Sequence, residues 1–276
     1  MSRTKRYGTM WLTHAVLILG AFTMVFPFFW QIWLSLMSNA EVTAVPPTLI
    51  PAQFKWQNYV TVFERIPFLN QFWNSVLITV IRTIGQVVLC SLAGYAFARM
   101  HFRGRGALLA VVLSILMVPG QIYLLPQYQL IQGMHLLDTT WGIVLPGIFS
   151  AFGTFLMRQF FLSLPVELEE AARLDGCSQF GVFWRIVLPL AKPALATLAI
   201  FTLLGSWNDL IWPLISISDD RWYTLQLGLA NFQGTRRTQW QLLMAGNVVA
   251  TVPLVAFFLV AQKHFIATMT FSGLKG

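Results

Sequence analysis

Three stretches of this chain contain no Asp, Glu, Lys or Arg, and they limit what the chain can fold into. They cover residues 7–40, 106–137 and 238–262 and are 34, 32 and 25 residues long. About 20 apolar residues cross the hydrocarbon core of a bilayer, so each stretch can hold a span. Only 10% of all residues are charged, against about 25% in a soluble globular domain. The pattern excludes a soluble fold and predicts an all-α polytopic membrane protein.

Six transmembrane helices with short loops account for the apolar pattern, because polar stretches cannot lie in lipid with unsatisfied backbone groups. We expect the helices at about residues 11–37, 71–98, 107–130, 139–157, 193–215 and 240–262. We expect residues 1–70 to form the amino terminus, first helix and outer loop, residues 71–262 a core containing a loop at 158–192, and residues 263–276 a tail. Prolines within these spans, at Pro27, Pro119, Pro126, Pro146, Pro213 and Pro253, can kink them.

The distribution of positive charge orients the six helices. The two termini and the loops at 99–105 and 158–192 hold 12 of the 18 lysines and arginines, whereas the other three loops hold 5. Loops rich in Lys and Arg stay on the cytoplasmic side. We therefore expect both termini in the cytoplasm, and we attribute the net charge of +8 to this topology rather than to a nucleic-acid partner.

The loop at 158–192 carries the most information, because it reads as two short helices joined by a turn. Pro165 suits the first turn of a helix, and acidic residues follow it, where the helix dipole favours negative charge. Gly176 suits a left-handed stop, and a second helix is expected from Ser178 to Val187. One face of the first helix is expected to be thin, so that another surface can approach it closely; its residues are Leu168, Ala171, Ala172 and Asp175.

This loop resembles the EAA loop of permeases from ATP-binding-cassette (ABC) importers. The matching pattern is Glu170-Ala171-Ala172, three residues, Gly176, nine residues, Ile186, one residue and Leu188-Pro189. The rest of the chain resembles the sugar branch of that family, in particular the maltose-type second permease subunit. Supporting stretches are residues 46–59, Phe155–Arg158, Trp207-Asn208-Asp209 and Trp212–Leu214, while the ending Ser272–Gly276 departs from the usual one.

The resemblance implies a division of labour in a bacterial cytoplasmic membrane. The chain pairs with a second permease subunit, two ATPase subunits bind ATP and Mg²⁺, and an extracytoplasmic binding protein delivers a sugar. The EAA loop docks on an ATPase subunit, with Glu170, Ala171, Ala172, Asp175, Gly176, Ile186, Leu188 and Pro189 as the implied coupling residues. The chain itself contains no Gly-x-x-x-x-Gly-Lys-Ser/Thr phosphate loop, so it is expected to bind no cofactor and to be no enzyme.

Four polar or aromatic residues in the spans are candidates for the solute path. Arg82 lies within the second span, and Trp207, Asn208 and Asp209 lie in the fifth. Intramembrane charges are costly and often functional, although a structural contact explains each of them equally well. An Arg82–Asp209 pair is one possibility. The four histidines have no partners at metal-binding spacing, so no metal site is expected.

Other functions remain as alternatives. A glycerol-3-phosphate-type ABC permease has the same architecture. An ion-coupled secondary transporter needs intramembrane carboxylates, and only Asp209 is available in the predicted spans. A membrane-embedded enzyme finds no support, because the His-Glu-x-x-His and Gly-x-Ser-x-Gly patterns are absent.

Overall fold

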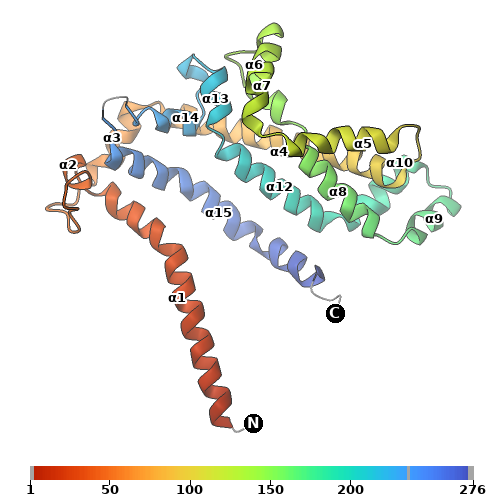
Figure 1. Cartoon of the computed structure of the whole chain (residues 1–276), viewed down its shortest axis with the longest axis horizontal. Helices are drawn as coiled ribbons and strands as arrows, with labels where there is room; N and C mark the ends of the chain where they lie inside the picture. Colours follow the sequence, from red (N-terminus) through yellow and green to blue (C-terminus); the bar gives the residue numbers. More distant parts are fainter. Residues whose placement is uncertain (1–2, 235–236, 273–276) are drawn as a thin grey trace. The chain divides into compact units, whose positions relative to one another are not determined.

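The structure, a computed structural model, describes the backbone of residues 3–234 and 237–272 and the side chains of residues 13–234 and 237–259. Across these residues the chain is helical (Figure 1). The described part contains no β-strand, only an isolated bridge between Gln233 and Thr238. The prediction of an all-α fold is confirmed.

The contacts within the chain form two compact units. The first combines residues 1–68 with 229–253, and the second combines residues 69–228 with 254–276. The first unit holds α1 (Arg3–Ser35), α2 (Asn39–Val42), α3 (Gln57–Arg65) and the start of α15 (Trp240–Ser272). The second holds α4 (Phe68–Arg99), α5 (Arg105–Ser114), α6 (Leu124–Gly133), α7 (Thr140–Val144), α8 (Ala151–Ser163), α9 (Glu167–Leu174), α10 (Gln179–Val182), α11 (Leu188–Leu190), α12 (Lys192–Trp207), α13 (Ile211–Ser216) and the start of α14 (Leu225–Ala230).

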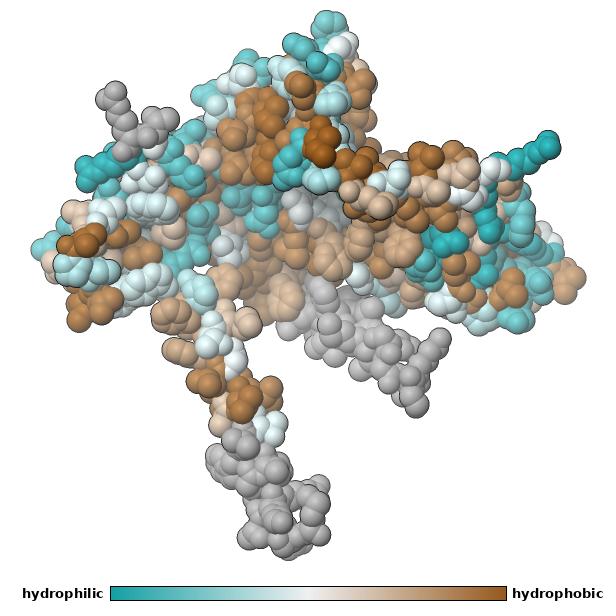
Figure 2. All heavy atoms as spheres, in the orientation of Figure 1, coloured by the Kyte–Doolittle hydropathy of each residue, from teal (hydrophilic) through white to brown (hydrophobic). Residues whose placement is uncertain are grey.

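Three continuous helices are long and apolar enough to cross a membrane. They cover Thr13–Ser35, Phe68–Arg99 and Trp240–Leu259, which matches the first, second and sixth predicted spans. Most of the first of them is unburied within the chain, and it exposes large apolar side chains such as Leu19 and Met24. Apolar side chains also make up much of the visible surface in Figure 2. Such a surface fits contact with lipid or with another hydrophobic helix.

The third, fourth and fifth predicted spans are not single straight helices, which corrects the sequence prediction. Arg105–Met117 and Gly120–Gly133 meet at 104°, and Thr140–Gly147 and Ala151–Ser163 meet at 42°. The first break falls at Pro119, which lacks an N–H and forces the residue before it out of the helical region. At the second break, the Ser150 hydroxyl accepts a hydrogen bond from the Gly153 N–H at 3.2 Å and so begins α8.

The fifth predicted span, residues 193–215, is also interrupted. The helix α12 ends at Trp207 and α13 begins at Ile211. Between them, the Asp209 carboxylate accepts a hydrogen bond from the Trp212 N–H at 3.4 Å. A side-chain acceptor at this position starts a new helix in place of continuing the old one. On the amino side, Gln179–Leu190 meets Lys192–Trp207 at 77°.

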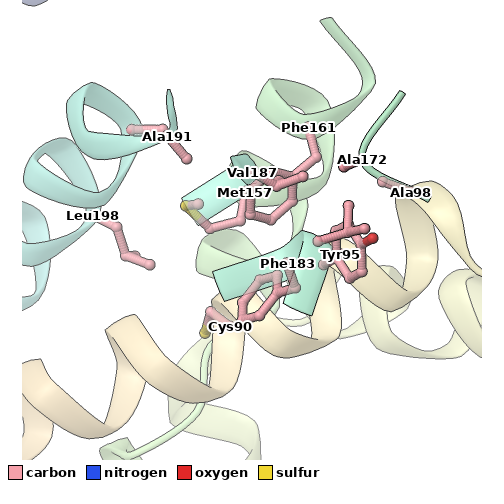
Figure 3. Packing of buried hydrophobic residues seen from close by; sticks show 12 residues of the cluster. Cys90, Tyr95, Ala98, Met157, Phe161, Ala172, Phe183, Val187, Ala191 and Leu198 are labelled. Carbon is pink, nitrogen blue, oxygen red and sulfur yellow. The ribbon is translucent and has the colours of Figure 1, made fainter. Parts of the chain in front are cut away.

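Close packing between α4 and α8 forms the centre of the second unit. A Cβ atom on Gly94 would lie 2.7 Å from the Met157 Cβ and 2.9 Å from the Arg158 backbone nitrogen. A small residue here therefore lets the two helices approach closely, as is common between membrane helices. Around this contact lies a cluster of buried apolar side chains that includes Cys90, Tyr95 and Met157 (Figure 3).

In the first unit, Glu41 organises the loop that follows α1. Its carboxylate accepts hydrogen bonds from the Ser38 N–H at 2.8 Å, the Ser38 hydroxyl at 2.7 Å and the Ala52 N–H at 2.8 Å. These bonds, that of the Ser38 hydroxyl above all, lower the pKa of Glu41 to about 2. Because the ionised form accepts all three bonds, the charged carboxylate holds the two ends of this loop together.

Candidate functional site

The helix α9 carries the first part of the predicted motif, and its carboxyl end is as the sequence indicates. The sequence predicts Pro165 in the first turn, but the helix begins at Glu167 after Val166, so Pro165 lies just before it. Glu167, Glu169 and Glu170 lie in its first turn. At its end, the Gly176 N–H donates to the Arg173 carbonyl at 3.0 Å and the Cys177 N–H donates to the Ala172 carbonyl at 2.9 Å. This is the Schellman arrangement, which needs a left-handed residue, and Gly176 has a φ of +83°.

The predicted thin face of this helix is corrected in one residue. Leu168, Ala171 and Asp175 are exposed, as expected for a surface that receives a partner. Ala172 is instead buried, at 7% exposure. The two alanines are neighbours about 100° apart around the helix, so they do not share one face. Ala172 contributes to the intramolecular core, and its small side chain lets α9 lie close to that core.

Apolar packing beneath α9 continues into the second helical segment of the loop. Val182, Phe183 and Val187 are buried with Tyr95 and Phe161 (Figure 3). The Tyr95 and Phe183 rings lie with centroids 5.0 Å apart. These contacts fix the helix–turn–helix against the ends of α4 and α8, so the loop is a packed element.

The second helical segment is longer than predicted. It runs through α10, a π-helical turn at Phe183–Val187 and α11, and it ends at Leu190, beyond Pro189. Pro189 lies in the last turn of this segment, directly after the π-helical turn. Of the remaining motif residues, Ile186 and Leu188 pack half-buried against the core.

A buried polar cluster, which the sequence prediction missed, fixes α9 from below. Glu169 is 2% exposed, and its Oε1 lies 2.8 Å from the Arg99 Nε. The Tyr95 hydroxyl donates to Glu169 Oε2 at 3.1 Å, and Arg173 lies one turn along the helix at 3.8 Å. The helical spacing of the sequence could have revealed that Glu169 is buried, because residues 169, 172 and 173 lie on one side of the helix.

The same cluster extends to the neighbouring elements. Gln179 at the start of α10 donates from its Nε2 to the Tyr95 hydroxyl at 3.0 Å. Arg99 also donates to the carbonyls of Phe161 and Leu164, at 2.8 and 2.6 Å. Since a helix end leaves its last carbonyls without intrahelical partners, Arg99 satisfies two such groups at the end of α8.

Above this buried side, α9 and α10 present an exposed surface with large apolar side chains. Leu174 is 90% exposed and Phe180 is 64% exposed. Glu170 and Gly176 are exposed as well. Exposed large apolar side chains rimmed by charge are typical of a protein-binding surface.

A second polar site lies between α4 and the α12–α13 break. Arg82, which is 6% exposed, donates from its Nη1 to the Asp209 carboxylate at 2.8 Å and from its Nη2 to the Ile143 carbonyl. The pair that the sequence left as a possibility is therefore present. One turn further along α4, Gln86 donates to the Gly147 carbonyl at 2.7 Å and accepts from the Thr202 hydroxyl at 3.0 Å.

Two small cavities adjoin Arg82. One of about 310 Å³ has polar lining from Arg82, Gln121, Tyr123, Gln127 and Asp209. The other, of about 240 Å³, is lined by residues that include Arg82, Gln86, Ser150, Thr202 and Ser206. Sequence reasoning did not single out the glutamines Gln121 and Gln127 as path residues, because no local pattern shows that the bend at Pro119 brings them to Arg82.

The other two candidates for the solute path do not line these cavities. Trp207 is buried at 5% exposure and packs edge-on against Phe72, with ring centroids 5.8 Å apart. Asn208 is exposed and donates to the Leu204 carbonyl at 2.9 Å, which closes the end of α12. Among the described residues, no group of three or more His, Cys, Asp or Glu side chains could hold a metal ion.

Comparison with known proteins gives consistent matches along nearly the whole chain. The chain is 37% identical to the arabinooligosaccharides transport system permease protein AraQ of Halalkalibacterium halodurans, over 96% of each chain. It is 34% identical to the sn-glycerol-3-phosphate transport system permease protein UgpE of Yersinia enterocolitica, over 95% of this chain and 96% of the relative.

The fold is also found among solved structures. A crystal structure of a bacterial ABC transporter involved in the import of the acidic polysaccharide alginate matches with a TM-score of 0.78 and 24% identity, over 96% of this chain and 99% of the other. Residues 86–270 match the family described as the inner membrane component of binding-protein-dependent transport systems. The chain belongs to this family, and it is a permease subunit of an ABC importer.

Proposed function

We propose that this chain is one transmembrane half of an ABC importer for a sugar or a related polyol. The observation that carries the proposal is the exposed motif on α9, held by its own buried side against the ends of α4 and α8. A packed helix with an exposed apolar face outside the spans needs a partner. The names of the relatives, among them the arabinooligosaccharide permease, support the sugar class.

The proposed topology has six spans. Three are the continuous helices, and the bent pairs within 105–133 and 140–163 supply the third and fourth. The fifth is α12 with α13, because the Gln179–Leu190 half of the remaining bent pair belongs to the loop at 158–192. The bias of Lys and Arg places the amino terminus, the loop at 158–192 and the tail in the bacterial cytoplasm. The last four residues of the tail at 263–276 lie outside the described residues. The proposed division into residues 1–70, 71–262 and 263–276 follows this topology and stays a prediction.

The assembly we propose contains a second permease subunit, two ATPase subunits carrying ATP and Mg²⁺, and an extracytoplasmic solute-binding protein. One relative structure is described as a complex with an alginate pentasaccharide-bound periplasmic protein, which supports the last of these partners. In this assembly Glu170, Ala171, Asp175 and Gly176 form the outer face of the coupling loop. Ala172 supports α9 from its buried side. The second helical segment of the loop contributes Ile186, Leu188 and Pro189.

The polar cavity beside Arg82 favours an uncharged solute over a phosphorylated one. The Arg82 guanidinium is already paired with Asp209 at 2.8 Å, and the remaining polar side chains that line the larger cavity are amides and a phenol. Amides and hydroxyls suit sugar hydroxyl groups, whereas a phosphate prefers an available Arg or Lys. In this proposal Arg82 and Asp209 border the path, and Trp207 and Asn208 support the end of α12.

Uptake by reconstituted vesicles tests this function. The chain is co-purified with its partner permease, the ATPase subunits and the binding protein, and the vesicles are loaded with ATP or, as the control, with ADP. We expect ATP-dependent uptake of radiolabelled arabinooligosaccharides and little uptake of glycerol 3-phosphate. Uptake that is equal with ADP and follows an imposed ion gradient would instead identify a secondary transporter.

A further inference from the structure

Glu169 stands immediately before the predicted coupling motif, on a different side of the helix from Glu170. Successive residues of a helix are about 100° apart, so Glu170 is exposed while Glu169 is 2% exposed. A carboxylate of this kind is rarely buried without partners, because burial of a lone charge is costly. Glu169 has three charged or polar partners, Arg99, Tyr95 and Arg173.

The partners of Glu169 belong to a transmembrane helix as well as to the loop. Tyr95 and Arg99 lie in the last two turns of α4, a helix long and apolar enough to span the membrane. The contacts are short, 2.8 Å to Arg99 and 3.1 Å to Tyr95. Apolar contacts alone allow one helix to slide on another, whereas a buried ion pair with a hydrogen bond has a defined geometry.

Arg99 links the cluster, which already joins α9 to α4, to a third helix, α8. Besides its pair with Glu169, it donates to the carbonyls of Phe161 and Leu164 at the end of α8. The ends of α4 and α8 and the first turn of α9 therefore meet at one guanidinium. Movement of α9 relative to α4 must break this cluster and leave charges buried without partners, which is strongly unfavourable.

We propose that Glu169 is a positioning residue that makes α9 and the inner end of α4 move as one body, so that closure of an ATPase subunit reaches the membrane helices. This inference rests on the proposed function and adds a role that differs from docking. The exposed face of α9 binds the partner, and the buried face transmits the movement.

The experiment compares Glu169→Gln with Glu167→Gln in the complete transporter. Both residues lie in the first turn of α9, but Glu167 is exposed. For Glu169→Gln we expect wild-type amounts of permease and bound ATPase and unchanged basal ATP hydrolysis. Stimulation of ATP hydrolysis by loaded binding protein should fall at least fivefold, and sugar uptake with it. Glu167→Gln should behave as wild type, and Glu169→Asp should keep at least half of the stimulation.

A distance measurement tests the mechanical part directly. Spin labels are placed at Val166 at the start of α9 and Leu92 on α4, both exposed, in a background with Cys90 and Cys177 replaced by alanine. The wild-type distribution of label distances should stay narrow with and without ATP. In Glu169→Gln it should broaden. A merely structural residue would lower the amount of folded transporter without broadening the distances in the molecules that fold.

Tyr95→Phe serves where the Glu169→Gln permease itself does not fold, because it removes only the hydroxyl that binds Glu169 and Gln179. We expect it to assemble and to reduce stimulation at least twofold. Normal stimulation in the assembled variants would overturn the inference, and so would loss of the ATPase subunits from Glu169→Gln, since that would place Glu169 in docking. The proposed function fails separately, if the wild-type complex shows no ATP-driven uptake.

Discussion

Arg82 on α4 and Asp209 at the break between α12 and α13 are 127 residues apart in sequence, and their side chains meet at 2.8 Å. The Arg82 side chain is 8% exposed and that of Asp209 is 23% exposed. Each charge compensates the other at membrane depth, where an unpaired charge is costly. The pair also joins the second predicted span to the interruption in the fifth.

Neutralising one member of this pair should therefore cost more than neutralising both. We expect Asp209→Asn or Arg82→Gln to destabilise the permease by about 3 kcal/mol, a typical cost of removing one partner of a buried pair. The double variant should recover part of that loss. The measurement is the unfolding temperature of the purified complex, followed by uptake at equal protein. A pair of single variants with wild-type stability and uptake would show that the contact is dispensable.

Gly176 allows a graded test of the stop at the end of α9. Its φ of +83° is strained for other residues although a Cβ would meet no atom within 4 Å. The left-handed region costs an L-residue roughly 1–2 kcal/mol, less for Asn. We expect Gly176→Val to lower retention of the ATPase subunits on purification and Gly176→Asn to retain most of them. Equal retention by the two variants would mean that the left-handed turn does not govern docking.

Reversal of charge at Glu170 tests the docking face. Glu170→Lys should insert into the membrane normally and lose ATPase subunits, because it places positive charge on the exposed face of α9. Glu64→Lys is the control, since it makes the same charge change at an exposed glutamate of α3, outside α9. Retention of bound ATPase is measured for both. The assignment of Glu170 to the interface is contradicted if the control loses as much ATPase as the variant.

The loop after α1 should loosen in acid. The pKa of Glu41 in the folded protein is lowered to about 2 from an ordinary value of 4.5. A group with a lowered pKa contributes stability above its ordinary value, and this is lost as pH falls from about 4.5 to about 2. We expect the Ser38 and Ala52 amides to keep their hydrogen-exchange protection at pH 6 and lose much of it near pH 3. Glu41→Gln should lower protection already at pH 6, and no difference at pH 6 would contradict the assignment.

The six-span topology predicts opposite sides for Ser178 and Ser218. Single cysteines at these positions, in a background without Cys90 and Cys177, should react with a membrane-impermeant reagent from the cytoplasmic and the outer side respectively. Labelling after detergent permeabilisation is the control for accessibility. If both react from outside, the order of the spans is wrong.

Sequence alone could predict the helical class, the long spans and the carboxyl end of α9, because these depend on local composition and on single residues such as Gly176. It could name Arg82 and Asp209 as intramembrane charges but could leave their pairing only as a possibility. Contacts across 127 positions depend on packing that no local pattern records.

The same limit explains the misplaced and missed residues. Glu169 and Glu170 are chemically identical neighbours, and only the position of the core decides which one is buried. Ala172 was placed on the outer face for the same reason. Pro119 marked a place where a helix can kink, but the 104° bend depends on the surrounding packing.

The break at Pro119 has a consequence for how the chain can exist in a bilayer. Arg105–Met117 contains 13 residues, and at 1.5 Å per residue it reaches only about 20 Å, against about 30 Å of hydrocarbon. Val118 and Pro119 are extended, and irregular backbone at membrane depth is tolerated only beside protein or water. We therefore expect an isolated copy of this chain to be unstable in a bilayer. Its rate of degradation in cells should depend on how quickly the proposed second permease subunit covers this break.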